Sequence, residues 1–245
     1  ILFIILQDKN GIAVETVQAL LSKVGVPIQA NIVNVTENHI IRCLACDICP
    51  THIDIDEDYR CIISKKTDDM HDLHVNFLDC DAIVPVVYSA VDDEDVVSNY
   101  QKFMERTRYL RRGDYVMGDH IVAPLVVQEV GTEENMAIRI LTSMLRHHTV
   151  MAKPIVLNRY QSRLLNLDAS IEQIQMMCSA AQQSTVGRIV VQSQETEHLK
   201  YHPVGYILSA VKDAEDEKLN KRRAMMDHRR EKALEAQQKR ISKIS

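Results

Sequence analysis

The hydrophobic pattern of the first 160 residues alternates between short apolar runs and amphipathic segments. The apolar runs have the continuous character of strands that are covered on both faces, and they lie at 1–6, 27–35, 82–88, 121–127 and 154–157. Between them, apolar residues recur at helical spacing, and these segments lie at 12–24, 69–78, 92–110 and 133–147. Strands that alternate with helices predict an α/β fold in which a parallel sheet carries helices on both faces.

The pattern changes from about residue 166 onward. Residues 169–181 have helical spacing, and the stretch Arg188–Gln192 predicts a sixth, edge strand or an arm. The segment 215–245 is charged and favours helix, with a thin apolar seam that recurs every seven residues. Such a segment is either a solvated terminal helix or a docking arm in an oligomer. We therefore expect two parts: an α/β domain at 1–165 and a mostly helical extension at 166–245 for oligomerisation or docking.

Composition and charge exclude several classes of protein. Hydrophobic residues make up 46% and charged residues 26%, as in an ordinary globular chain. The net charge of −5 argues against nucleic acid as a partner, because phosphate binding needs a positive face. The sequence has no apolar run of about 18 residues that would span a membrane and no basic, apolar signal segment, so we expect a cytoplasmic protein.

Four of the six cysteines form a group on a predicted loop at 42–62. Cys43, Cys46 and Cys49 are separated by two residues each, and Cys61 follows later. Three closely spaced thiolates and a more distant fourth favour a [4Fe–4S] cluster, because structural zinc sites usually come as two separated pairs. A zinc site, a dithiol redox pair and reduced thiols without a cofactor remain alternatives.

Other residues with metal-binding chemistry have simpler interpretations. Cys80 and Cys178 lie in apolar contexts and are expected in the core. His71 and His74 are three residues apart on a predicted helix, which suits a metal pair but is more often a pair of surface residues.

Several short pieces of the sequence resemble the iron–sulfur flavoprotein branch of the NADPH-dependent FMN reductase family. The two most specific pieces are the cysteine group and Glu105-Arg106-Thr107 with the preceding Phe103 and Met104. The other matching pieces lie at 61–63, 68–70, 80–84, 87–88 and 131–134, so that the match covers residues 1–158.

The resemblance implies a flavodoxin-like, five-stranded parallel sheet that binds FMN at the carboxyl ends of its strands, in keeping with the rule for open α/β sheets. It also implies a [4Fe–4S] cluster on the four cysteines and a homodimer or homotetramer. The FMN phosphate would lie on the loop after the first strand, and the ring between the loops after the third and fourth strands. The residues implied to bind FMN are Gln7, Lys9, Asn10, Gly11, Val87, Tyr88, Ser89, Ala90, Glu129, Val130, Gly131 and Thr132.

The first loop departs from the family pattern. The family has a hydroxyl-rich loop, whereas this chain has Gln7, Asp8 and Lys9 and no hydroxyl before Thr16. Backbone N–H groups at the start of the helix can still hold a phosphate, with Lys9 adding favourable charge and Asp8 opposing it. Tyr88 has two interpretations, a contact with the flavin ring or a structural tyrosine at a strand end.

The resemblance implies an FMN-dependent oxidoreductase that passes electrons between flavin and a [4Fe–4S] cluster, with NAD(P)H or a protein electron carrier as its partner. No acid–base residue is required by such chemistry, and none is assigned. Two alternatives stay open: a non-catalytic flavodoxin-like module with a structural zinc or cluster site, and a plain NAD(P)H:FMN or quinone reductase without a cluster.

Overall fold

The computed structural model describes most of the chain. The described residues are 1–36, 39–46, 48–50, 60–63, 68–71, 73–90, 96–111, 116–118, 120–132, 135–193 and 209–241. Parts of the predicted helices at 92–110 and 133–147, and of the predicted cysteine loop at 42–62, lie outside these residues.

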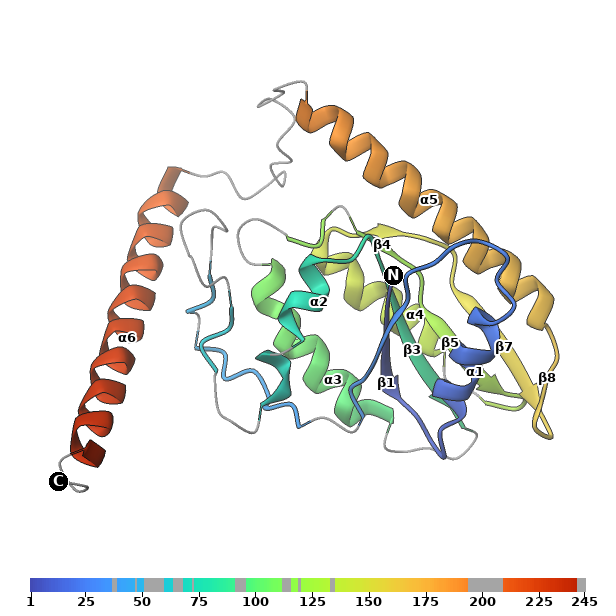
Figure 1. Ribbon diagram of the computed structural model, residues 1–245, viewed down its shortest axis with the longest axis horizontal. Helices are drawn as coiled ribbons and strands as arrows, with labels where there is room; N and C mark the ends of the chain where they lie inside the picture. Colours follow the sequence, from blue (N-terminus) through green and yellow to red (C-terminus); the bar gives the residue numbers. More distant parts are fainter. Residues whose placement is uncertain are drawn as a thin grey trace.

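A mostly parallel sheet forms the centre of the molecule (Figure 1). Its strands are β1 (Leu2–Gln7), β2 (Asn31–Asn34), β3 (Ala82–Ser89), β4 (Ile121–Val122), β5 (Leu125–Glu129), β6 (Val150–Met151), β7 (Ile155–Tyr160) and β8 (Arg163–Leu164). The order β2-β1-β3-β5-β7 is parallel throughout, and β8 adds an antiparallel hairpin strand to β7. This strand order is that of the doubly wound flavodoxin-like sheet. The predicted fold class is confirmed.

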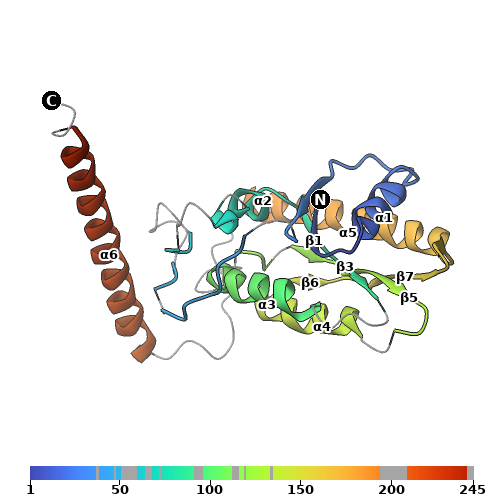
Figure 2. The ribbon, with the colours of Figure 1, turned by 90° about the horizontal axis from the view of Figure 1, so that it is seen from below.

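Helices cover both faces of the sheet (Figure 2). The helical segments are α1 (Ile12–Leu21), η1 (Asp69–His71), α2 (His74–Leu78), α3 (Val96–Arg106), η2 (Thr107–Arg111), α4 (Met136–Met144), η3 (Leu145–His147), α5 (Leu167–Ser193) and α6 (Ser209–Ile241). Helices α1 and α5 pack on one face with Phe3 and Ile5 of β1, while α3 and α4 pack on the other with Leu2 and Ile4. The alternation along β1 follows from the two-residue period of a strand.

The sequence pattern misjudged several element boundaries. The predicted strand at 121–127 is two strands, β4 and β5, because the chain breaks at Pro124, which has no backbone N–H for the ladder. The predicted edge strand Arg188–Gln192 is wrong: these residues continue α5, which runs without a break from Leu167 to Ser193. The strands β6 and β8 are too short to give a periodic signal.

The predicted C-terminal extension begins with a helix that is part of the core. Ile174 and Met177 of α5 are buried against the strands of the sheet. Helix α6 lies apart from the sheet, on the side of the cysteine-bearing segment (Figures 1 and 2). Among the helices within the described ranges, none combines the length and apolarity needed to cross a membrane. An oligomerisation or docking role for 166–245 stays a prediction.

A buried histidine makes stability depend on pH. Burial, followed by the charges of Arg111 and His148, lowers the pKa of His147 from 6.5 to about 4. Below about pH 6.5 the unfolded chain therefore binds a proton that the folded chain does not. We expect the free energy of unfolding to fall as the pH drops from about 6.5 to about 4, by on the order of 3 kcal/mol in total.

Urea unfolding near pH 7 and near pH 5 checks this contribution. Replacing His147 by glutamine is expected to weaken the pH dependence in that interval, because the substituted side chain does not titrate. His228, which is exposed on α6, is the control position, and His228→Gln should leave the dependence unchanged. Equal pH dependence in wild type and His147→Gln would contradict the assignment.

Candidate functional site

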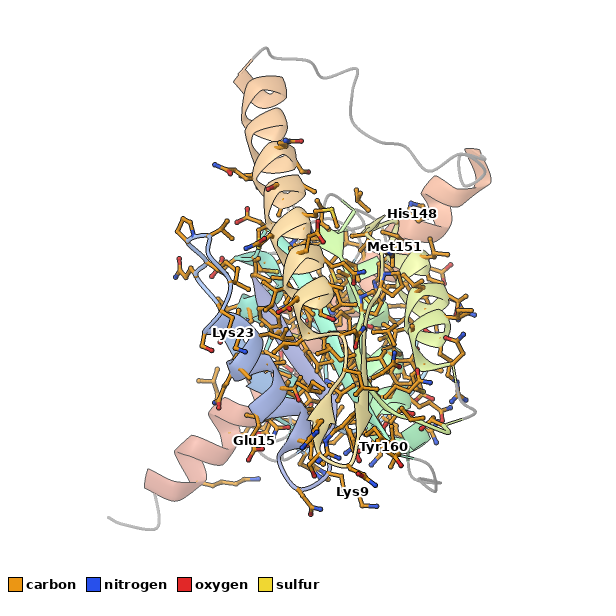
Figure 3. The ribbon with its side chains drawn as sticks, turned by 90° about the vertical axis from the view of Figure 1, so that its right-hand side faces the viewer. Lys9, Glu15, Lys23, His148, Met151 and Tyr160 are labelled. Atoms are coloured by element: carbon orange, nitrogen blue, oxygen red, sulfur yellow. The ribbon has the colours of Figure 1, made fainter. Side chains whose placement is uncertain are left out.

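The residues implied to bind flavin gather at the carboxyl edge of the sheet. By element, they are Gln7 at the end of β1; Lys9, Asn10 and Gly11 in the loop before α1; Val87, Tyr88 and Ser89 on β3, with Ala90 after it; and Glu129, Val130, Gly131 and Thr132 at and after the end of β5. In Figure 3, Lys9 lies at the same end of the molecule as Tyr160, the last residue of β7, and opposite His148 and Met151. The fold therefore brings these loops to one edge; their contact with flavin stays a prediction.

The side chain of Asp8 closes the loop between β1 and α1. Its carboxylate accepts backbone hydrogen bonds from Lys9 at 2.7 Å, Ala13 at 2.8 Å and Val14 at 3.4 Å. Gly11 precedes the helix in a left-handed conformation (φ 75°), which a glycine adopts without steric strain. The N-terminus of a helix is a binding position for anions, and here the chain's own carboxylate takes that position.

This arrangement decides whether an FMN phosphate fits the loop. A phosphate at the start of α1 would compete with Asp8 for the amide groups of Ala13 and Val14, and it would bring a second negative charge beside the carboxylate. The loop, as it is placed, therefore does not fit the phosphate of FMN. The positive charge of Lys9 does not change this, because those two amide groups already have an acceptor.

The strands β3, β5 and β7 carry a polar network at the same edge. The Tyr88 hydroxyl donates a hydrogen bond to the Glu129 carboxylate at 2.8 Å, and Arg159 forms an ion pair with that carboxylate. Burial, then the hydrogen bond to Glu129, raises the pKa of Tyr88 to about 12, so the hydroxyl stays protonated and remains a donor. The Tyr88 side chain packs in the core beside α1 and α5. Tyr88 thus has a structural partner, while its contact with a flavin ring stays a prediction.

The loops after β3 and β5 are joined directly. The Thr132 hydroxyl donates to the backbone oxygen of Ser89 at 3.3 Å. Gly131 adopts φ 101°, a conformation that favours glycine, and a Cβ built there would meet no atom within 4 Å. The two loops that the resemblance assigns to the flavin ring are therefore neighbours held by a hydrogen bond.

Three of the four grouped cysteines are electrostatic neighbours. Burial raises the pKa of the Cys61 thiol; the thiols of Cys46 and Cys43 raise it as well, whereas a backbone hydrogen bond from Ile63 and the charge of Arg106 lower it. Such influence acts over several ångströms, so Cys61 lies in the same region as Cys43 and Cys46, although it is far along the chain from them. The side chain of Cys46 is exposed, and those of Cys43 and Cys61 are half-buried.

The donor set of the cysteine group suits a soft metal centre, but the ligands are not assembled around one. Cys49 and Cys61 pack against the hydrophobic core. Within the described residues, no three His, Cys, Asp or Glu side chains are arranged so that they could hold a metal ion. The thiols therefore have the chemistry that an iron–sulfur cluster or zinc requires, but they would have to move closer together to bind one.

A buried ion pair holds the chain that leads into the cysteine group. The Arg106 guanidinium of α3 contacts the Asp68 carboxylate at 2.7 Å, and the two side chains are 1% and 0% exposed. Arg106 also donates to the backbone oxygen of Ile41 at 2.8 Å, while Asp68 accepts from the Ile41 N–H at 3.1 Å. Both residues belong to the short pieces of sequence on which the family resemblance rests. Together they hold the backbone of Ile41, two residues before Cys43, in place.

The pairing of Asp68 with Arg106 was not predicted from the sequence. The hydrophobic spacing of α3 predicts an inner face that includes Tyr100 and Phe103, and Arg106 lies about 120° around the helix from Tyr100, outside this face. The structure nevertheless buries Arg106, and a buried charge needs an ionic partner, because burying it alone is costly. The pattern does not say which of the many carboxylates is the partner.

The histidine pair of the sequence analysis needs a correction. His74 is not a surface residue: it is 3% exposed and its Nδ1 lies 2.7 Å from the Tyr109 hydroxyl. The helix α2 is only five residues long, and it packs its His74 and Phe77 inward. The position of the His71 side chain lies outside the described part.

Comparison with known proteins gives distant similarities of fold. No family model and no curated protein matches the chain. Among solved structures, it is similar to the flavodiiron core of a Synechocystis protein (9% identity, TM-score 0.41), an oxidoreductase from Corynebacterium diphtheriae (9%, 0.43) and a flavone reductase (12%, 0.40). The alignments cover 75%, 76% and 82% of this chain, and 36%, 96% and 65% of the respective structures. At this distance they transfer no activity.

Proposed function

We propose that the chain is a redox protein whose centre is the cysteine group, with a [4Fe–4S] cluster held by Cys43, Cys46, Cys49 and Cys61. The observation that carries this proposal is that one guanidinium, that of Arg222, donates to the backbone oxygens of both Ile48 and Arg60, which brings the segments of Cys49 and Cys61 together across a separation in sequence. The charge of Arg106 beside Cys61 supports it, because a cluster with four thiolate ligands is an anionic group. A bound cluster would supply one-electron transfer, with a protein electron carrier as the partner; NAD(P)H, which gives up a hydride, would be a partner only together with a bound flavin.

The flavin part of this proposal is FMN at the carboxyl edge, as the sequence resemblance implies. The neighbouring loops that contain Ser89 and Thr132 support a ring site there. The Asp8 carboxylate opposes the phosphate site, so FMN binding would require Asp8 to leave the start of α1. For this reason we derive no electron-transfer step through the flavin.

The same Asp8 contact favours a second candidate function. In this case the chain is a flavodoxin-like module without flavin, in which the cysteines hold zinc or a cluster for assembly only. Protein purified without oxygen, with its absorbance spectrum recorded and its iron, zinc and flavin quantified, separates the candidates. Redox function predicts about four iron atoms per chain and a broad brown absorbance. A colourless protein with stoichiometric zinc supports the second candidate, and flavin without iron supports a plain flavin reductase.

Replacing Cys43 by serine is expected to remove most of the iron and leave the fold intact. The reason is that Cys43 is half-buried on a segment outside the sheet, where a serine hydroxyl costs little, whereas a hydroxyl is a poor ligand for iron in a cluster. Iron content and far-ultraviolet circular dichroism check the two parts of the expectation. Cys178→Ser on α5 is the matched control and should keep the iron. Full iron retention in Cys43→Ser would exclude Cys43 as a ligand.

A further inference from the structure

Helix α6 contains an arginine, Arg222, that is buried although most of the described side chains around it are exposed. Arg222 is 3% exposed, whereas the adjacent Lys221 and Arg223 are exposed to solvent. An arginine is almost never buried to this extent unless its charge and donors have partners. The partners of Arg222 therefore indicate what this helix is built to contact.

The partners lie on the cysteine-bearing segment. Arg222 Nη1 donates to the backbone oxygen of Ile48 at 3.1 Å, and its Nη2 donates to that of Arg60 at 2.7 Å. Arg229, seven residues later, donates to the backbone oxygen of Ile62. Seven residues are about two turns of an α-helix, so the two arginines lie on the same side of α6.

These three carbonyl groups belong to residues that are adjacent in sequence to two of the cysteines. Ile48 directly precedes Cys49, while Arg60 and Ile62 directly precede and follow Cys61. A single guanidinium thus joins the segment that contains three closely spaced cysteines to the segment that contains the fourth. The planar fork of an arginine can reach two acceptors at once in a fixed geometry, which an ammonium group cannot reproduce.

We propose that α6 is a clamp on the cysteine group, in which Arg222 is the positioning residue that holds the segment of Cys61 against the segment of Cys49. Arg229 holds Cys61 from its other side through the Ile62 carbonyl. The clamp also brings positive charge to a group whose metal-bound thiolates are negative, which favours the metal-bound form. This inference rests on the proposed metal-binding function of the cysteines. If the clamp exists, the C-terminal helix is part of the cysteine site and is not merely a solvated terminal helix.

The clamp predicts that removing Arg222 loosens the cysteine segment even when no metal is present. In reduced, metal-free full-length protein, Cys49 and Cys61 of Arg222→Ala are expected to react with iodoacetamide about tenfold faster than in wild type, because two charge-assisted hydrogen bonds are lost. Labelling of each cysteine is followed by mass spectrometry, with Cys178 as the internal reference. Arg222→Lys is expected to resemble Arg222→Ala, since one ammonium does not bridge both carbonyls.

Matched controls and a second readout keep this test decisive. Arg223→Ala and Arg230→Ala remove exposed arginines of the same helix and should leave all labelling rates at the wild-type value. Arg229→Ala should accelerate the labelling of Cys61 more than that of Cys49.

The second readout is metal uptake: the iron content after reconstitution should fall at least severalfold in Arg222→Ala. Wild-type labelling rates at Cys49 and Cys61 in both Arg222 variants would overturn the clamp. Wild-type protein that takes up no metal would overturn the proposed function, while the labelling rates would still test the clamp.

Discussion

Replacing Arg106 by methionine is expected to lower the free energy of unfolding by about 3–5 kcal/mol. The substitution leaves the Asp68 carboxylate as a buried charge without its cationic partner, and it removes a hydrogen bond to the Ile41 carbonyl. Methionine fills a similar volume, so the loss measures electrostatics and hydrogen bonding more than packing. Urea unfolding at neutral pH, followed by circular dichroism, gives the change in free energy.

Two controls distinguish a buried ion pair from a general sensitivity of this region. Arg42 contacts Glu105 near the same segment, but its side chain is 59% exposed, so Arg42→Met should cost far less than Arg106→Met. Combining Arg106→Met with Asp68→Leu should recover part of the loss, because the unpaired charge is then absent. A cost for Arg106→Met no larger than that for Arg42→Met would show that the ion pair does not stabilise the fold.

The Arg106 substitution also has a consequence for the cysteine group. Arg106 and Asp68 together fix both backbone polar groups of Ile41, and Arg106 acts electrostatically on Cys61. The pair therefore links the folding of α3 to the position of the cysteine segment. The pieces at 68–70 and 103–107 on which the resemblance rests contain the two members of this ion pair, Asp68 and Arg106.

The fold was predictable from the sequence because its signals are local. Apolar runs such as Leu2–Leu6 and amphipathic spacing in Ile12–Leu21 report strands and helices wherever tertiary packing agrees with them. The errors occurred where local and tertiary signals diverge. Arg188–Gln192 contains β-branched residues typical of a strand, but it continues a helix already nucleated and packed upstream. Short strands such as β6 pair only because the neighbouring β4 is in place.

The candidate site was predictable only in part. Cysteine spacing identified the cysteine group, and the carboxyl-edge rule identified the loops that gather at one edge of the sheet, because both signals are carried by short pieces of sequence. The partners of Arg106 and Arg222 lie at long sequence separation: Ile41 for the first and Ile48 for the second. No periodicity encodes such pairings. Asp8 was predictable in part. The sequence showed that its charge opposes a phosphate in this loop, but it did not show the hydrogen bonds that its carboxylate accepts from α1.

Replacing Asp8 by serine is expected to raise the affinity for FMN by about 10- to 100-fold, which corresponds to about 1.4–2.7 kcal/mol. The substitution frees the backbone N–H groups of Ala13 and Val14 for a phosphate and removes a negative charge beside it. Serine also supplies a hydroxyl that can donate a hydrogen bond to a phosphate. Loss of the carboxylate at the start of α1 should cost about 1 kcal/mol of stability, which the protein can tolerate.

Riboflavin provides the matched ligand, because it has the same ring and no phosphate. Its affinity should be the same in wild type and in Asp8→Ser, and wild type should prefer FMN little or not at all. Asp8→Asn should fall between the two, since it removes the charge but keeps an oxygen that can accept from Ala13. Asp79→Ser, which removes an exposed carboxylate after α2, is the control for a change in net charge. Titrations followed by quenching of flavin fluorescence measure all of these affinities.

The comparison of the two ligands separates the phosphate loop from the ring site. Equal gains for FMN and riboflavin in Asp8→Ser would mean that the substitution acts on the ring site or on the fold, and not on a phosphate. Tight FMN binding by wild type would show that Asp8 leaves the helix when the phosphate arrives. A gain confined to FMN would locate the phosphate at the start of α1 and identify Asp8 as the residue that keeps it out, because the two ligands differ by the phosphate alone.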